Sequence, residues 1–167
     1  MPKPLQLASP RFNDGEPIPI AFTAEGEDKA PPLQWGEVPA GTRSLALLVE
    51  DPDAPDPKHP QRIWCHWVLY NIPPGTRNLP EGATAAAGLL PPGTREGMND
   101  WQRIGYGGPC PPIGRHRYVH RLIALDIVLP DMGPITRAQL LDAIQGHIVA
   151  EADLIGTYEK AHPHVQA

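Results

Sequence analysis

The stretch RYVHRLIALDIVL, at positions 117–129, is the longest apolar and β-branched run in the chain, and a Gly/Pro-rich loop and Pro130 bound it. Two shorter runs share its character, SLALLVE at 44–50 and WCHWVLYNI at 64–72, and each ends at a proline-rich turn. Such runs between turn formers predict β-strands. The prolines stand at the ends of the runs and in the connections, which is typical of a sandwich with long loops.

Weaker elements flank these three strands. Residues 8–43 are expected to hold two or three short strands among their prolines, and residues 80–100 are expected to form a long loop. Residues 148–158 alternate between a mainly apolar set and a half-acidic set, which predicts a half-exposed final strand. A continued helix is the alternative for that segment.

One helix is predicted in the C-terminal half of the chain. Thr136 and Gln139 have the spacing of a capping box, in which each side chain bonds a backbone N–H of the other residue. Leu140, Leu141 and Ile144 follow at helical spacing, and Gly146 is a natural end.

Composition narrows the fold class. The chain has 167 residues, which fits a single domain over 1–167, and it contains 23 Pro and 16 Gly. So many helix breakers exclude a coiled coil and a long-helix bundle, while 41% hydrophobic residues exclude a disordered chain. We therefore expect a mostly β, antiparallel β-sandwich with one peripheral helix and long Pro/Gly-rich loops.

The charge balance also limits the choice of partners. With 14 basic and 19 acidic residues, the net charge of −5 gives no bulk attraction to nucleic acid or to an anionic membrane. No apolar run is long enough for a transmembrane segment or a signal-peptide core, so a cytoplasmic location is expected. Cys65 and Cys110 are too few for a disulfide framework and are expected to be reduced thiols.

The first concentration of chemistry-bearing residues is Asp51-Pro52-Asp53-Ala54-Pro55, followed by Trp64-Cys65-His66-Trp67. Asp51 and Asp53 are two residues apart, so in an extended segment their carboxylates can point the same way. Alternation places His66 on one strand face with Trp64, Val68 and Tyr70. The alternative is a simple Asp/Pro turn and a half-buried histidine bonded to a backbone carbonyl.

The second concentration is the loop GGPCPPIG at 107–114, which runs into RHRY at 115–118. Alternation puts His116, Tyr118 and His120 on one strand face and Arg117 and Arg121 on the other. Local positive charge beside imidazole and phenol donors suits an anion such as phosphate or carboxylate. The alternative is a structural loop whose arginines pair with acidic residues elsewhere.

Together the two segments resemble the phosphatidylethanolamine-binding protein family, also called Raf-kinase-inhibitor-like, and especially its bacterial and archaeal branch. The motifs are DPDAP at 51–55, W-x-HW at 64–67, GYGGPCPPxGxHRY at 105–118 and ALD at 124–126. Weaker matches, from PPLQW at 31–35 to GHIVAEADLIGTY at 146–158, extend the resemblance over essentially the whole chain.

The resemblance implies an antiparallel sandwich with a small pocket for anions such as phosphate, acetate or a phosphoryl head group. His66 and His116 would donate to ligand oxygens, Tyr118 would add a hydroxyl, and Asp51 or Asp53 would orient an imidazole. A homodimer is expected for this branch, and regulation of a protein partner such as a kinase is associated with the eukaryotic members. Carried over by motif, the lining consists of Asp51, Asp53, Pro55, His66, Pro109, His116 and Tyr118.

Several further expectations concern the neighbours of this pocket. Cys65 should face the core, at most one of Trp64 and Trp67 should floor the pocket, and Arg115 should add charge at its rim. Loop 88–98 is a candidate cover for its mouth.

The leading functional hypothesis is a binding protein without a cofactor, a metal or assigned catalytic residues. A hydrolase that uses the Asp, His and Tyr side chains with Cys110 is the alternative. Zinc binding by two histidines and an aspartate is a third, weaker hypothesis.

Overall fold

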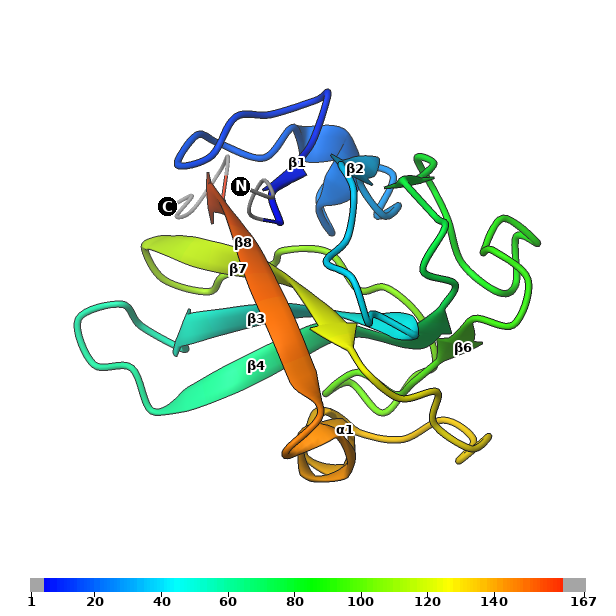
Figure 1. Ribbon diagram of the computed structural model, residues 1–167. Coiled ribbons are helices and arrows are strands. Elements are labelled where there is room, and N and C mark those ends of the chain that lie inside the picture. The colour runs from blue at the N-terminus through cyan, green and yellow to red at the C-terminus, as the bar shows by residue number, and fades with distance from the viewer. Residues whose placement is uncertain (1–4, 161–167) are drawn as a thin grey trace, which may run out of the picture.

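The structure is a computed structural model that describes residues 5–160, and it consists of two antiparallel sheets and one helix (Figure 1). The larger sheet has the strand order β6-β4-β3-β7-β8, and the smaller sheet has the order β1-β2-β5. The predicted fold class, mostly β with antiparallel sheets and a single helix, is confirmed. The strands are β1 (Leu7–Ala8), β2 (Leu33–Trp35), β3 (Ser44–Ala54), β4 (Arg62–Ile72), β5 (Asn78–Leu79), β6 (Arg95–Glu96), β7 (Arg115–Leu125) and β8 (Ile148–Glu159); the helices are α1 (Arg137–Ile144) and the 3-10 turn η1 (Ile20–Phe22).

Two of the predicted strands have different ends in the structure. β3 continues through Ala54, because Asp51 still pairs with Trp64 and Ala54 with Arg62 across the start of β4. The DPDAP segment that the sequence marks as a turn is therefore partly strand. In contrast, the strand predicted over 117–129 is shorter at its end: β7 ends at Leu125, and residues 126–129 lie outside the sheet.

The helix and the final strand are confirmed. The Thr136 hydroxyl accepts from the backbone N–H of Gln139, whose side chain accepts from the N–H of Thr136. After α1, Gly146 adopts a φ of +82°, a conformation that favours glycine. β8 then follows and pairs with β7 along nearly its whole length.

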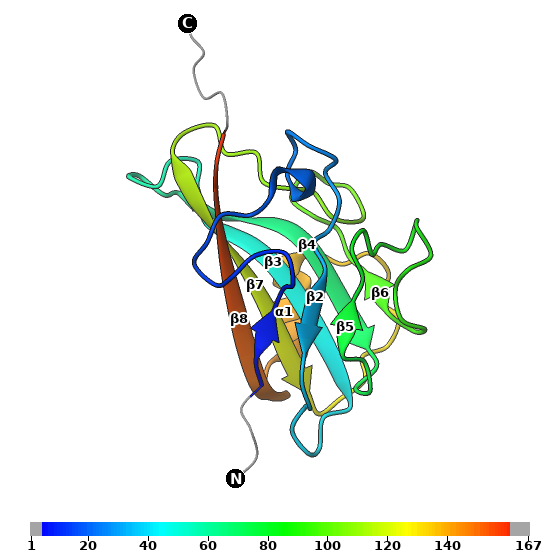
Figure 2. The same ribbon diagram turned by 90° about the horizontal axis from the view of Figure 1, so that it is seen from above.

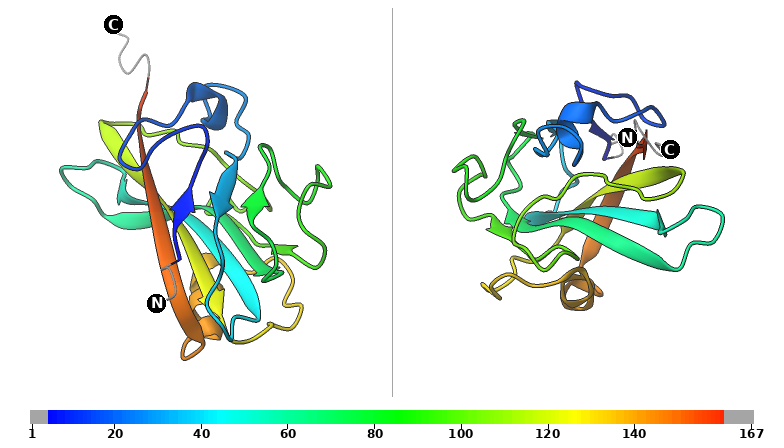
Figure 3. Two further views of the ribbon diagram at one scale, coloured as in Figure 1. Left: turned by 45° about the horizontal axis from the view of Figure 1, so that its top comes forward. Right: turned by 180° about the vertical axis from the view of Figure 1, so that it is seen from behind.

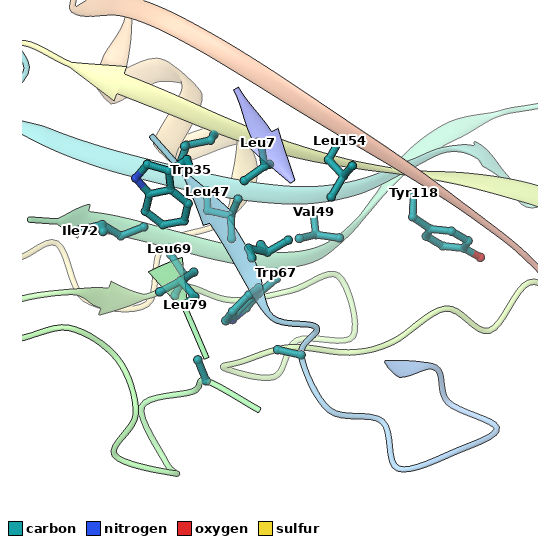
Figure 4. Close-up of a cluster of buried hydrophobic side chains, with 14 of the residues drawn as sticks. Leu7, Trp35, Leu47, Val49, Trp67, Leu69, Ile72, Leu79, Tyr118 and Leu154 are labelled. Carbon is teal, nitrogen blue, oxygen red and sulfur yellow. The ribbon is translucent and has the colours of Figure 1, made fainter. Parts of the chain in front are cut away.

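Between the two sheets lies the first hydrophobic cluster, part of which is shown in Figure 4. Leu47, Trp67 and Leu69 of the larger sheet meet Leu7 and Trp35 of the smaller one in this cluster. Tyr118 lies at one end of the group, with its hydroxyl directed away from the other labelled side chains (Figure 4). Tyr118 therefore belongs to the core but lies at its edge.

The second hydrophobic cluster lies on the opposite face of the larger sheet, where α1 packs (Figure 2, Figure 3). Leu140 and Ile144 of α1 are buried there. Glu50 is buried on β3 and accepts hydrogen bonds from Arg121 of β7, at 3.0 Å, and from Arg137 of α1. These charged contacts tie the helix to the two central strands. Within residues 5–160, no helix is long and apolar enough to cross a membrane.

His120 is a buried histidine within the larger sheet. Its Nδ1–H donates to the backbone oxygens of Tyr118 and Leu154, both at 3.1 Å, and its ring packs against Phe12. Its Nε2 is buried and has no hydrogen-bond partner among the described residues. Burial lowers the pKa of His120 to about 4. The folded protein therefore holds this ring neutral.

This arrangement predicts a loss of stability in acid. Below pH 6.5 His120 is protonated in the unfolded chain but stays neutral in the folded protein. The free energy of unfolding is therefore unaffected by this residue above that pH and falls as the pH drops toward 4. We expect the histidine to cost about 2 kcal/mol of unfolding free energy between about pH 7 and about pH 5. Urea unfolding at both pH values measures this loss. His120→Asn should remove about this share of the pH dependence, and a similar share should remain because burial also lowers the pKa of His66 to about 4. Replacing the exposed His59 by Asn is the control and should keep the wild-type slope; equal slopes in both variants would contradict the assignment.

Candidate functional site

A cavity of about 270 Å³ opens at the end of the larger sheet where β3 ends and β4 and β7 begin. Because these three strands are neighbours in the sheet, residues far apart in the sequence meet there. The loop 105–114 and the segment around Trp101 close the remaining sides. The lining residues are Asp51, Ala54, Pro55, Arg62, Trp64, His66, Trp101, Cys110, Pro111, Pro112, His116 and Tyr118.

Five of the seven residues predicted for the site line this cavity, and two do not. The five are Asp51, Pro55, His66, His116 and Tyr118. Asp53 is absent from the lining, because its carboxylate accepts from the backbone N–H of Arg117 at 2.8 Å and from the Arg117 guanidinium at 2.8 and 3.0 Å. The guanidinium hydrogen bond lowers the pKa of Asp53. Pro109 is also absent; its carbonyl accepts from the N–H of Ala24 at 2.9 Å.

The position of His66 depends on a β-bulge. Val49 pairs with Trp67 while the next residue, Glu50, pairs with Cys65, so His66 is an extra residue in β4. His66 contacts Tyr118, a member of the first cluster, and Trp67 also belongs to that cluster. Cys65 and the later residues Val68 and Tyr70 belong to the second cluster.

The bulge corrects the predicted alternation along β4. His66 shares its side of the sheet with Trp64 at the cavity but not with Val68 and Tyr70. The prediction that Cys65 faces the core is confirmed, as is the prediction that only one of the two tryptophans reaches the cavity. That tryptophan is Trp64, while Trp67 is buried in the first cluster.

The imidazole of His66 is held in one tautomer. Its Nδ1–H donates to the carbonyl of Gly107 at 2.7 Å, and its ring meets those of Tyr118 and Trp101 edge to face at centroid distances of 5.2 and 5.0 Å. Burial lowers the pKa of His66 to about 4. At neutral pH the ring is therefore uncharged, and Nε2 carries a lone pair rather than a proton.

The imidazole of His116 has no nitrogen left for a ligand. Nδ1 lies 2.5 Å from Oδ2 of Asp51, and Nε2 lies 2.8 Å from the carbonyl oxygen of Ile113. Burial raises the pKa of Asp51. The carboxyl group and the ring form a pair that is shielded from solvent. Asp51 contacts an imidazole as predicted, and both ring nitrogens of His116 have protein partners in this structure. Donation from His116 to a ligand, which would require Nε2 to leave the Ile113 carbonyl, stays a prediction.

Tyr118 carries a polar group that has no partner among the described residues. The residue is 1% exposed, and its hydroxyl has no hydrogen-bond partner among the described residues. Its ring lies between those of His66 and His116, edge to face with the first and stacked on the second at 6.3 Å. Burial raises the pKa of Tyr118, so the phenol keeps its proton and can donate it in a hydrogen bond.

Two lining residues, Arg62 and Trp101, lie outside the segments that the sequence analysis singled out. Arg62 lies two residues before Trp64, and alternation along β4 would have placed it on the same face; its guanidinium lies 6.0 Å from the Trp64 ring. Trp101 had no local signal. Its segment is fixed to β4 by Asp100, whose N–H donates to the Cys65 carbonyl and whose carboxylate accepts from the Cys65 N–H.

The predicted cover is not where it was expected. No residue of loop 88–98 lines the cavity, and Arg95 and Glu96 of that loop form β6, which pairs with Tyr70 and Leu69 farther along β4. Arg115 is exposed and lies 3.7 Å from Glu159, and it is not among the lining residues. Over residues 5–160, no group of three or more His, Cys, Asp or Glu side chains has the geometry of a metal site.

Comparisons with known proteins agree with this geometry. A family model described as phosphatidylethanolamine-binding protein matches residues 8–159. A UPF0098 protein of Methanothermobacter thermautotrophicus is 46% identical over 157 residues, covering 93% of this chain and 99% of the relative. LppC of Mycobacterium tuberculosis, whose name marks it as a candidate lipoprotein, is 40% identical over 159 residues, which cover 94% of this chain and 72% of the relative.

A solved structure shows the same fold. The crystal structure of CT736 from Chlamydia trachomatis, described as a homologue of phosphatidylethanolamine-binding protein, superposes with a TM-score of 0.85 at 43% identity. The match covers 94% of this chain and 98% of the other. The chain therefore belongs to the phosphatidylethanolamine-binding protein family.

Proposed function

We propose that this protein binds small ligands through an anionic group, phosphate or carboxylate, held in the cavity at Tyr118. The observation that carries the proposal is at Tyr118, a lining residue of the cavity whose buried hydroxyl has no hydrogen-bond partner among the described residues. Leaving a buried donor unsatisfied costs about 1–3 kcal/mol, so an acceptor that enters the cavity recovers this free energy. An anionic oxygen is the strongest such acceptor.

The rest of the cavity suits the organic part of such a ligand. Arg62 supplies a positive charge, while Trp64 and Trp101 supply aromatic walls and Pro111 and Pro112 supply aliphatic ones. A volume of about 270 Å³ is close to the lower limit of small-molecule pockets, about 300 Å³. This space exceeds what a bare anion needs, so an anion attached to a short apolar or aromatic group fits the walls better.

The geometry favours binding over hydrolysis. A general base needs a pKa near the working pH, but the pKa of His66 is about 4. His116 pairs with Asp51 as in a hydrolytic dyad, yet its Nε2 faces the Ile113 carbonyl instead of a nucleophile. Neither histidine is therefore placed to act as a general base, and we assign no catalytic residue.

The homodimer, the cytoplasmic location and a regulated partner such as a kinase stay predictions. Closed two-fold dimers are the commonest oligomers, and light scattering of the purified protein measures this property. Cell fractionation tests the location, for which the name of LppC points to an alternative at the membrane.

One test of the proposed function concerns the phenol of Tyr118. Removing the Tyr118 hydroxyl with Tyr118→Phe should weaken the binding of inorganic phosphate and of phenyl phosphate by about tenfold, because a hydrogen bond to a charged acceptor is lost. Chemical-shift titration with each anion measures the affinity. Tyr70→Phe is the matched control, since Tyr70 is buried on the opposite face and bonds the Gly133 carbonyl. Equal affinities in the wild type and Tyr118→Phe would rule out this role for the phenol.

Another test concerns the protonation of Nε2 of His66. Since its Nδ1–H is used by Gly107, the ring can donate to an anion only after Nε2 gains a proton. Sulfate, which stays a dianion and brings no proton, should therefore bind more tightly as the pH falls from about 7 to about 5, by up to about tenfold per unit. Titration calorimetry in buffers of different ionisation enthalpy should show proton uptake.

The control for this experiment is His66→Asn, in which an amide keeps a donor for the Gly107 carbonyl but does not titrate. In this variant the pH dependence of sulfate binding should flatten. A flat profile in the wild-type protein would show that His66 does not contact the anion.

A further inference from the structure

The two cysteines of the chain have opposite environments. Cys65 is buried in the second cluster, and burial raises the pKa of its thiol to about 12, which makes it unreactive. Cys110 is exposed and lines the cavity. A reagent that enters the cavity therefore meets one thiol and not the other.

The cavity wall fixes the position of Cys110. Its neighbours Pro109, Pro111 and Pro112 have restricted φ angles, which stiffens the segment. The Pro109 carbonyl is bonded by the N–H of Ala24 at 2.9 Å, and the Gly108 N–H donates to the Asp28 carboxylate at 2.7 Å. The cysteine thus lies on a preformed wall and not on a free loop end.

A second feature of the same cavity points to a ligand. Tyr118 lines the cavity together with Cys110 and is 1% exposed, and its buried hydroxyl has no hydrogen-bond partner among the described residues. An anion that satisfies this hydroxyl brings the rest of its molecule into the 270 Å³ space that Cys110 borders. A thiol and a residue with an unpartnered hydroxyl therefore border the same small cavity.

We propose that Cys110 is a ligand-directed thiol-modification site, at which a small disulfide bearing a carboxylate docks by that anion at Tyr118 and exchanges with the cysteine. This inference rests on the proposed anion binding. The Cys110 thiolate attacks one sulfur of the disulfide, so that its S–S bond breaks as the bond to Cys110 forms. The leaving thiolate keeps the electron pair and takes a proton from water, and no further oxidant is needed.

Modification would close the cavity to other anions. The disulfide-linked group occupies space bounded by Trp64, Trp101 and Cys110, where the organic part of another ligand would lie. A thiol that reverses the exchange would reopen it. Anion binding would then respond to the thiol–disulfide balance around the protein.

The test compares two disulfide reagents, the dianionic dithiobis(nitrobenzoate) and the neutral dithiodipyridine, each normalised to its rate with a free cysteine derivative. The native protein should react at one thiol, about tenfold faster with the anionic reagent than with the neutral one. Inorganic phosphate should slow only the anionic reaction. Cys110→Ser should abolish the fast phase, and mass spectrometry should locate the adduct on Cys110.

Tyr118→Phe separates docking from simple exposure. If the anion docks at the phenol, this variant keeps its reaction with dithiodipyridine but loses the preference for the anionic reagent. Equal normalised rates in the wild-type protein would overturn the inference. If phosphate binds in the titration and the rates are nevertheless equal, only the cysteine proposal fails; if phosphate does not bind, the proposed function fails as well.

Discussion

The site depends on one extra residue in β4. At the bulge, His66 is inserted between the residues that pair with Val49 and Glu50, so it and Trp67 both contact the side of the sheet that carries the first cluster. Without the insertion, strict alternation would turn either the cavity histidine or the core tryptophan to the α1 side. Bulges next to functional sites re-aim side chains in this way. The same local irregularity therefore supplies the core and the cavity.

The bulge also anchors the loop that closes the cavity. His66 bonds Gly107 twice: its ring Nδ1–H donates to the Gly107 carbonyl, and its own carbonyl accepts from the Gly107 N–H at 3.0 Å. A Cβ at Gly107 would lie 2.4 Å from the Trp101 ring, and one at Gly108 would lie 2.5 Å from the Phe22 carbonyl. Only glycine permits these approaches. The Gly/Pro-rich composition of the chain thus includes positions at which the site needs a close and rigid backbone.

Alternation along a strand predicts the face of a side chain only where the strand pairing is regular. Alternation correctly places His116 and Tyr118 together because β7 pairs with β8 without a bulge in that region. It fails at His66, since no residue type announces the bulge. It also fails at Asp53, whose partner Arg117 depends on the register between β3 and β7. The position of Trp101 at the cavity could not be predicted from the sequence. It depends on where a long loop packs, and tertiary contacts such as those of Asp100 with β4 determine this.

The distribution of protons explains why this constellation is better suited to binding than to catalysis. The Asp51 carboxyl group accepts from the backbone N–H of Asp53 and pairs with His116, whose other ring nitrogen lies at the Ile113 carbonyl, so both side chains have partners within the wall. His66 is neutral because it is buried, and Tyr118 keeps its proton for the same reason. Within the described part of the chain, each of these four buried side chains is thus either neutral or paired, and a buried unpaired charge would be costly. An anion that enters the cavity can then interact with Arg62, with the phenol and with His66 once that ring has gained a proton.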